Sequence, residues 1–300
     1  MNQSKNVDTL HLGVHVSISG GVEEAIPRAV EIGCTSIQIF SRNPRGWKSA
    51  PLTSRSIEEF RKRAQETGIH PVVIHTPYLF NLASGVEELY QRSISGLALD
   101  VHRAEQLGAR CVVTHLGSPR EKGRNFGVQR VARALQELCR RDTSVAILLE
   151  NSAGAGKSLG SRFEELQEII AIAGCQGKVG VCFDTCHGFA AGYDLRTRDT
   201  VTALAREIKR TIGRKSLALL HLNDCSGGLG SHLDRHAHIG KGKIGSAGFR
   251  SLLHDPFFRG LPMILETPKE QIDSDLKNMN KIKGIYFELP ASLIKGKRGD

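Results

Sequence analysis

Short apolar runs that alternate with amphipathic stretches are the feature of this sequence that most restricts its fold. Eight runs rich in Val, Ile and Leu recur along the chain, and a stretch with the apolar spacing of a helix follows each of them. Such aliphatic density is typical of strands buried on both faces, as in a parallel sheet. Eight strand–helix pairs predict an α/β fold, a (β/α)8 TIM barrel of the xylose-isomerase-like type, with its active site at the carboxyl ends of the strands.

The expected strands are 10–16, 35–40, 70–75, 110–115, 145–150, 178–183, 216–222 and 262–266, and the expected helices are 22–33, 54–68, 86–108, 126–141, 161–174, 199–213, 246–254 and 270–282. Thr53, Ser54 and Ser161 precede acidic first turns and predict helix starts. Pro27 predicts that the first helix is shortened or kinked. An open doubly wound sheet is the alternative, but no G-x-G-x-x-G turn follows the first run.

Domain organisation and charge limit the number of domains and the class of binding partner that the chain can have. No Pro/Gly/Ser-rich linker interrupts the alternation, so we expect one domain over 1–284 and a basic tail over 285–300. The net charge of +10 favours a polyanionic partner, above all nucleic acid. Residues 277–300 hold six Lys or Arg and two acidic residues, so the remainder of the chain is basic as well.

The sequence also predicts the compartment. No apolar run approaches the roughly 18 residues that a membrane span needs, and the first residues do not resemble a secretion leader. Seven cysteines are an odd number for a disulfide framework, and they are scattered through apolar segments. We therefore expect a reducing compartment, the cytoplasm, and no membrane association.

Ionisable side chains stand at or just after the ends of the last six expected strands. In a barrel these positions share one mouth, and burying them there is costly unless partners compensate. The nine candidate metal ligands are His75, His115, Glu150, Asp184, His187, His221, Asp234, His236 and Glu266. Imidazole and carboxylate ligands together favour Zn²⁺, with Mn²⁺ or Fe²⁺ as alternatives. Because one zinc takes three or four ligands, nine with a shared carboxylate fit two or three ions, as in phosphoryl-transfer centres.

Other residues near these positions are weaker candidates. His15 ends the first strand and is a candidate support for a ligand, or a structural residue. His232 and His238 flank Asp234 and His236 and compete with His236 as ligands. Cys182 and Cys186 lack a second cysteine pair, which favours buried structural thiols over a metal site.

Several motifs together make the chain resemble the endonuclease IV family, the zinc-dependent apurinic/apyrimidinic (AP) endonucleases of base excision repair, also called AP endonuclease family 2. The resemblance covers about residues 11–282, and its most specific segments are DTCH-x-FAAGYD and DRH-x-x-IG. The motifs are GVHVSISGG (13–21), SRNPRGW (41–47), HTPYLFNL (75–82), ENSAG (150–154), VCFDTCHGFAAGYDLRT (181–197), HLNDC (221–225), GSHLDRHAHIGKGKIG (230–245) and LET (265–267).

The resemblance implies a barrel with three zinc ions in its mouth, Mn²⁺ being an alternative at one site. His75 and His115 would bind one ion, and Glu150 would bridge it to a second ion. Asp184, His221 and Glu266 would complete the second ion's ligands, and His187, Asp234 and His236 would bind the third. Leu116 and Lys241 depart from residues found in some members, and neither is a ligand position.

The activity implied is hydrolysis of a DNA phosphodiester 5′ to an abasic site, giving a 3′-hydroxyl and a 5′-deoxyribose phosphate, with trimming of blocked 3′ ends. Glu150 and Glu266 are the expected catalytic carboxylates, with Glu266 orienting the nucleophile. One alternative is a sugar isomerase or epimerase with a single metal held by Glu150, Asp184, His221 and Glu266. A DNA-binding module without catalysis is another alternative, which nine intact ligand positions argue against.

The resemblance also implies how the lesion is recognised. Loops after the second and third strands would enter the minor groove of double-stranded DNA, and Arg45, Tyr78 and Leu79 match the inserting positions. Planar or apolar side chains inserted between base steps bend DNA in this way. Tyr78 and Leu79 have the alternative role of packing their own loop. We expect a monomeric enzyme.

Overall fold

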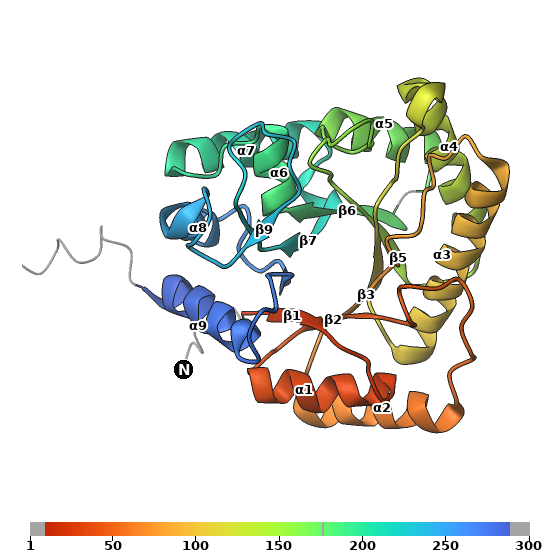
Figure 1. Cartoon of the computed structure of the whole chain (residues 1–300), viewed down its shortest axis with the longest axis horizontal. Helices are drawn as coiled ribbons and strands as arrows, with labels where there is room; N and C mark the ends of the chain where they lie inside the picture. The colour runs from red at the N-terminus through yellow and green to blue at the C-terminus, as the bar shows by residue number, and fades with distance from the viewer. Residues whose placement is uncertain (1–9, 176, 289–300) are drawn as a thin grey trace, which may run out of the picture.

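The computed structural model describes residues 10–175 and 177–288. Eight parallel strands close into a barrel in the order β1-β10-β7-β6-β5-β4-β3-β2 (Figure 1). They are β1 (Leu12–Val16), β2 (Ile37–Phe40), β3 (Val72–His75), β4 (Cys111–Thr114), β5 (Ala146–Glu150), β6 (Val179–Asp184), β7 (Leu217–His221) and β10 (Met263–Leu265). Seven of them lie inside the expected apolar runs and β6 extends one residue past its run, so the predicted barrel is confirmed.

Helices surround the barrel (Figure 1). They are α1 (Ala25–Ile32), α2 (Ser54–Thr67), α3 (Glu87–Leu107), α4 (Arg124–Cys139), α5 (Phe163–Ala173), α6 (Thr185–Ala191), α7 (Arg198–Thr211), α8 (Gly245–His254) and α9 (Ser274–Phe287), with 3₁₀ turns η1 (Val22–Glu24), η2 (Arg120–Lys122) and η3 (Arg214–Ser216). Among the described residues, no helix is long and apolar enough to cross a membrane.

Two apolar clusters hold the barrel together. The smaller cluster includes Val73, Val113, Leu148 and Ile264 from four strands, and it fills the inside of the barrel. The larger one lies between the strands and the surrounding helices and includes fully buried side chains such as Phe60 and Phe249. Burial on both faces is what the unbroken aliphatic runs require.

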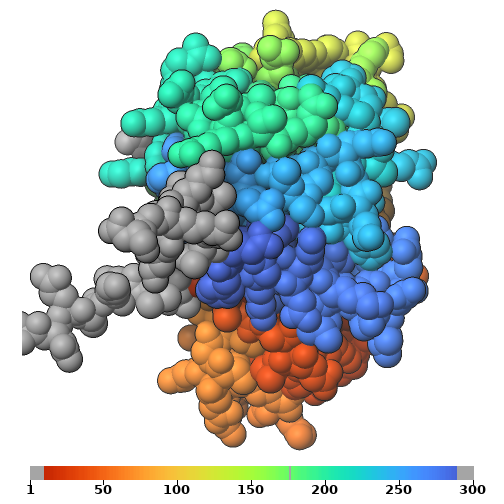
Figure 2. All heavy atoms as spheres, turned by 90° about the vertical axis from the view of Figure 1, so that its left-hand side faces the viewer, coloured from red at the N-terminus to blue at the C-terminus, as the bar shows by residue number. Residues whose placement is uncertain are grey.

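The two ends of the described chain meet where the barrel closes. Leu12 lies opposite Met263, and Val14 lies opposite Leu265, in the parallel pairing of β1 with β10. Figure 2 shows the same neighbourhood from the side, with the dark blue α9 against α1 of the first part of the chain. The first and last strand–helix pairs are therefore structural neighbours.

The observed helix starts can be compared with the cap residues predicted from the sequence. The Thr53 side chain accepts a hydrogen bond from the backbone N–H of Ser56, as expected of a cap. The prediction for Ser161 is wrong: α5 begins at Phe163 without a side-chain cap, and the Glu165 carboxylate instead accepts from Gly160 N–H ahead of the helix. Pro27 lies in the first turn of α1, where its missing N–H costs nothing, and the helix is shortened as predicted.

Four elements differ from the sequence-based expectation. The helix α6 directly follows β6, and the Asp184 side chain caps it by accepting from His187 N–H. A two-stranded antiparallel sheet, β8 (Asp224–Cys225) with β9 (His236–Ala237), folds the segment after β7. The last helix starts four residues later than expected and continues to Phe287, past the expected domain boundary at 284. Most of the expected tail, 289–300, lies outside the described residues.

The cysteines require one correction. Cys139, at the end of α4, and Cys175, after α5, form a disulfide, so the expected absence of disulfides is wrong for this pair. The two helices are packing neighbours and bring the Cα atoms to 6.0 Å, a juxtaposition that spacing in the sequence does not reveal. The other five cysteines are buried and free.

Candidate metal centre

The carboxyl ends of the strands carry the ionisable residues into one mouth. His75, Glu150, Asp184 and His221 are the last residues of β3, β5, β6 and β7. His115 and Glu266 come directly after β4 and β10, and His187 lies in the first turn of α6. Asp234 and His236 come from the long segment after β7, which β8 and β9 fold back over the mouth.

All nine predicted ligand residues are brought together, in three groups. The ligand atoms within each group lie within 4.8 Å of one another. The three groups of predicted ligands are His75, His115 and Glu150; Glu150, Asp184, His221 and Glu266; and His187, Asp234 and His236. A fourth group joins Cys186 with Asp184 and His236. Glu150 belongs to two groups, so a carboxylate is shared between adjacent groups.

The central group converges most closely. Nδ1 of His221 lies 3.1 Å from Oε1 of Glu150 and 3.2 Å from Oε2 of Glu266. The same nitrogen is 3.9 Å from Oδ2 of Asp184. All of these side chains except Glu266 are fully buried. Three carboxylates around one imidazole nitrogen suit a cation.

The histidines are oriented as metal ligands are. Nδ1 of His75 and of His187 lies 2.7 and 3.0 Å from the carbonyl oxygens of Thr76 and Asn151, and Nδ1 of His236 lies 2.9 Å from that of Glu266. Donation from Nδ1 leaves Nε2 free to accept a cation in each of these rings. In metal sites the second ring nitrogen usually donates to an oxygen in this way, which fixes the tautomer and the ring orientation.

The outer group has two imidazole nitrogens face to face. Nε2 of His236 lies 3.4 Å from Nε2 of His187, and Oδ1 of Asp234 is 3.2 Å from the latter atom. The Asp234 side chain is 54% exposed, whereas His187 is buried. This group therefore contains the most exposed of the nine side chains, and His115 of the first group, 37% exposed, is the next.

The pKa values show how strongly the site attracts positive charge. Burial alone would lower the pKa of His187, but the charge of Asp184 and the contacts with Asp234 and Glu150 outweigh it and raise that pKa well above 6.5. The pKa of His221 is also raised well above that value, against its burial. Burial would raise the pKa of Glu150 and of Glu266, but the surrounding histidines hold both well below 4.5. Protons on these histidines thus provide the charge that bound cations would supply.

Three amide side chains support the ligands, and the sequence reading did not identify them. Gln38 contacts both His221 and Glu266, with its side-chain oxygen 2.8 Å from Nε2 of the histidine. Asn223 donates to Oδ2 of Asp184 at 2.6 Å and accepts from the backbone N–H of Glu266. Asn151 accepts from the backbone N–H of Asp184. Each follows or lies within a strand that ends in the mouth, which is the signal that could have identified them.

His15 supports the centre without joining a group. Its Nδ1 lies 3.3 Å from Oε1 of Glu266 and 3.0 Å from Nε2 of Gln38. Burial lowers the pKa of His15, so the ring is neutral. This agrees with the expected supporting role.

The competing histidines and cysteines lie outside the three groups. His232 contacts the carbonyl oxygen of Ala153, and His238 contacts Glu270 and Asn278. Burial in the barrel raises the pKa of Cys182 to about 12. Cys186 lies near Asp184 and His236, but a hydrogen bond with Cys225 and burial keep its pKa far above the ordinary thiol value. Both thiols stay protonated, which agrees with a structural role.

Asp224, just after β7, organises the loop that carries the outer group. Its carboxylate accepts from the backbone N–H groups of Gly240, Gly242, Ile244 and Gly245. The glycine-rich loop 240–245 is thus wrapped around an internal carboxylate, with these amides already engaged. Pairing of Asp224 with Ala237 places His236 at the start of β9.

The three predicted DNA-contacting residues lie in loops at the same end of the barrel. Arg45 is exposed in the loop after β2, and Tyr78 is 63% exposed after β3, with its ring 6.2 Å from that of Phe40. Leu79 is half-buried and packs against the main apolar cluster, so packing accounts for part of its role.

A buried ion pair positions the Arg45 loop. Nε of Arg42 lies 3.0 Å from Oδ1 of Asp100 in α3, and both side chains are almost fully buried. Arg42 also donates to the carbonyl oxygen of Trp47 at 3.1 Å, across the loop. Arg42 is therefore a structural residue, although the sequence shows it beside Arg45 in one basic motif.

Comparison with known proteins agrees with this geometry. The model of the xylose isomerase-like TIM barrel family matches residues 26–284. Over 274 residues the chain is 46% identical to a probable endonuclease 4 from Methanoculleus marisnigri, with 91% of this chain and 97% of the relative covered.

Solved structures give the same result. The crystal structure of endonuclease IV from Thermus thermophilus matches with a TM-score of 0.82 and 36% identity, covering 93% of this chain and 100% of that chain. A D-tagatose 3-epimerase-like protein matches with a TM-score of 0.70 at 20% identity, covering 95% of this chain and 100% of that one, and this likeness concerns the fold alone.

Proposed function

This chain belongs to the endonuclease IV family of DNA-cleaving AP endonucleases, and we propose that it hydrolyses the phosphodiester 5′ to abasic sites at a centre of three zinc ions. The products would be a 3′-hydroxyl and a 5′-deoxyribose phosphate, and the same site would trim blocked 3′ ends. The observation that carries the proposal is the set of three neighbouring ligand groups, two of which share Glu150.

The donor set fits zinc. Each group offers three or four imidazole and carboxylate atoms, the number and type that zinc takes. His75, His115 and Glu150 would hold one ion, and Glu150, Asp184, His221 and Glu266 a second. His187, Asp234 and His236 would hold the third, with Mn²⁺ as an alternative ion at one site. When bound, such ions lower the pKa of water and neutralise charge on phosphate oxygens.

Two carboxylates have further roles in this proposal. Glu150 is fully buried and contacts histidines of all three groups, so it sets the spacing between them. Glu266 is held by Gln38 and His15 at Oε1, while Oε2 faces His221. Its side chain is 19% exposed, which gives it access to the substrate and allows it to orient the attacking water.

Recognition of double-stranded DNA would use the rim of the mouth. Arg45, Tyr78 and Leu79 would enter the minor groove at the missing base, where less stacking has to be broken than at a paired nucleotide. The net charge of +10 favours the phosphate backbone on either side. We propose that the enzyme acts as a monomer on DNA in the cytoplasm.

A sugar isomerase with one metal would use only the central group, Glu150, Asp184, His221 and Glu266. It gives no role to the other five ligand positions or to the basic charge. Metal analysis distinguishes the two functions, since about three ions per chain fit the nuclease and about one fits the isomerase.

The deciding experiment is cleavage of a duplex that contains a single abasic-site analogue, with and without a chelator. We expect a single cut 5′ to the analogue, abolished by chelation and restored by zinc. No cut by protein that carries three zinc ions per chain would contradict the proposal and favour a DNA-binding module.

A further inference from the structure

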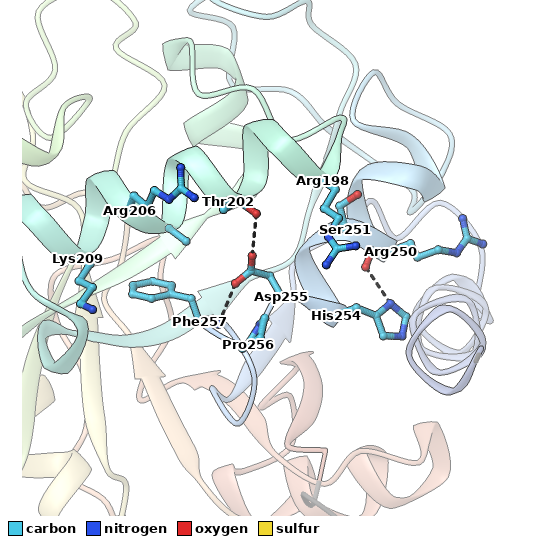
Figure 3. Close-up of a pocket in the computed structure, with 11 residues that line it drawn as sticks. Arg198, Thr202, Arg206, Lys209, Arg250, Ser251, His254, Asp255, Pro256 and Phe257 are labelled. Carbon is cyan, nitrogen blue, oxygen red and sulfur yellow. Dashed lines mark hydrogen bonds between the residues drawn. The ribbon is translucent and has the colours of Figure 1, made fainter. Parts of the chain in front are cut away.

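A groove separates α7 from α8 on the outer wall of the barrel, away from the metal centre. It encloses about 710 Å³, within the range of pockets that bind small ligands or short peptides. Figure 3 shows Arg198, Thr202, Arg206 and Lys209 along α7, opposite Arg250, Ser251 and His254 of α8, with Asp255, Pro256 and Phe257 at the lower corner.

The α7 side of the groove is a row of cations. Arg198, Arg206 and Lys209 are exposed, and their spacing of eight and three residues places them on one side of the helix. Within residues 10–175 and 177–288, no carboxylate forms an ion pair with these three side chains. Arg250 on the other side is paired with Glu288. The groove therefore offers positive charge that the described part of the chain leaves unpaired.

The corner of the groove is apolar. Phe257 is only partly buried and lies beside Pro256 and Ala205. The guanidinium of Arg214 lies 5.3 Å from the Phe257 ring centre, which adds a further cation at this end. An apolar corner next to cations suits a ligand with both carboxylates and a large apolar side chain.

Among the described residues that line the groove, Asp255 is the one carboxylate, and it forms hydrogen bonds within the protein. It accepts from the backbone N–H of Phe257 at 2.8 Å and from Oγ1 of Thr202 at 3.3 Å. These bonds hold the corner against α7. Thr202 lies between Arg198 and Arg206 in α7, so the unpaired cations flank this contact on both sides.

The direction of the groove argues against the DNA substrate as its occupant. The helix α7 begins at the mouth end of the barrel, and Lys209 lies eleven residues farther, about 16 Å down the outer wall at 1.5 Å per residue. A duplex lying across the mouth would touch only the Arg198 end. The apolar corner at Phe257 also has no use for a phosphate backbone.

We propose that this groove binds an acidic peptide segment of another protein, with one large apolar side chain placed against Phe257. The carboxylates of the segment would pair with Arg198, Arg206 and Lys209. The carboxyl-terminal residues 295–300 of this chain, KGKRGD, carry mainly positive charge and do not fit this role. Such a contact would leave the mouth of the barrel free for DNA.

The test is a selection from a displayed library of random twelve-residue peptides on the full-length, zinc-loaded protein. The double variant Arg206→Glu with Lys209→Glu serves for counter-selection. We expect the selected peptides to contain three or more Asp or Glu residues and one Phe, Trp, Leu or Ile. A labelled copy should bind the groove variant at least tenfold more weakly in fluorescence anisotropy, and replacing its apolar residue by Ser should weaken binding at least threefold.

A matched variant, Arg133→Glu with Arg140→Glu, changes the same charge at α4 on another part of the wall. It should bind the peptide within twofold of the wild type, and the groove variant should still cleave abasic duplex. Failure to obtain an acidic, apolar-containing consensus, or equal loss in both charge variants, would overturn the proposal. Displacement of the peptide by undamaged duplex, lost in the groove variant, would assign the groove to DNA instead.

Discussion

Nε2 of His221 lies 2.8 Å from the side-chain oxygen of Gln38, so this histidine presents Nδ1 to the three carboxylates of the central group. The orientation is the reverse of that in His75, His187 and His236, which present Nε2. One glutamine in the middle of β2 thus determines which nitrogen of a histidine on β7 can bind a cation.

Gln38→Met should weaken zinc binding at the central group by about 10- to 100-fold, as is typical when a partner that orients a ligand is lost. The substitution keeps the side-chain length but removes the contacts with His221 and Glu266. Competition with a chelator measures the affinity. Gln136→Met, on the surface of α4, is the control, and unchanged zinc affinity in Gln38→Met would show that Gln38 does not orient His221.

Loss of a proposed ligand should reduce turnover on abasic duplex by at least 100-fold while the fold is kept. Glu150→Gln should lower the zinc content by more than one ion, because Glu150 belongs to two groups, whereas His236→Ala should lower it by one. Asp184→Asn should lower turnover to a similar extent.

His238→Ala is the matched control for these ligand variants, since His238 lies two residues from His236 and outside the three groups. Circular dichroism and metal analysis should accompany the kinetic assays. Near-normal cleavage by all three folded ligand variants would rule out the proposed centre.

Arg45→Ala with Tyr78→Ala should weaken binding to abasic duplex at least tenfold more than binding to undamaged duplex, at one salt concentration. Both side chains are exposed at the mouth and belong to no ligand group, so the zinc content should not change. Arg61→Ala with Val30→Ala, on α2 and α1, is a control that removes one exposed cation and one exposed apolar side chain elsewhere. Equal losses of affinity for the two duplexes would show that Arg45 and Tyr78 do not read the lesion.

The buried histidines predict how the stability of the metal-free protein depends on pH. Because the folded-state pKa values of His187 and His221 are raised above 6.5, their stabilisation is present below about 6.5 and is lost as the pH rises through those values. The pKa values of Glu150 and Glu266 are lowered, so their stabilisation is present above about 4.5 and is lost at lower pH. Burial lowers the pKa values of His15 and His115, which reduces stability on the acid side of 6.5.

Zinc should therefore raise Tm more at pH 8 than at pH 6, because cations compete with protons for the same histidine nitrogens and fewer protons are bound at the higher pH. Thermal unfolding of chelator-treated and zinc-loaded protein at both pH values measures the difference. His238→Ala should show the same pattern, and an equal or smaller rise at pH 8 would contradict the charge assignment.

The barrel could be predicted because each strand is buried on both faces and its sequence is therefore a continuous run of aliphatic residues. The ligand positions could be predicted for a related reason. A polar or charged side chain at the end of a buried strand costs free energy unless it has partners, and this applies to His75, Glu150 and His221. Grouping the ligands required the resemblance to a family, because spacing in the sequence does not give distances between strands.

Other features escaped prediction because their cause is tertiary. Gln38 lies inside an apolar run. Its role in orienting His221 is visible only in the structure, where side chains of β2 and β7 meet inside the barrel. The helix α6 overlaps a segment whose Asp184 and His187 were already accounted for as ligands, and β8 and β9 contain only two residues each. The disulfide depends on the packing of α4 against α5, which no local pattern encodes.

Closure of the barrel by β1 and β10 has a consequence for the order in which the protein becomes competent during synthesis. A nascent chain synthesised only as far as residue 150 already contains every member of the first ligand group. The central group is complete only after Glu266 has been added. That residue directly follows β10, the strand whose pairing with β1 completes the ring. The nascent chain therefore cannot bring all three groups together before its last strand is made, and translation products that end before Glu266 would lack the complete central group.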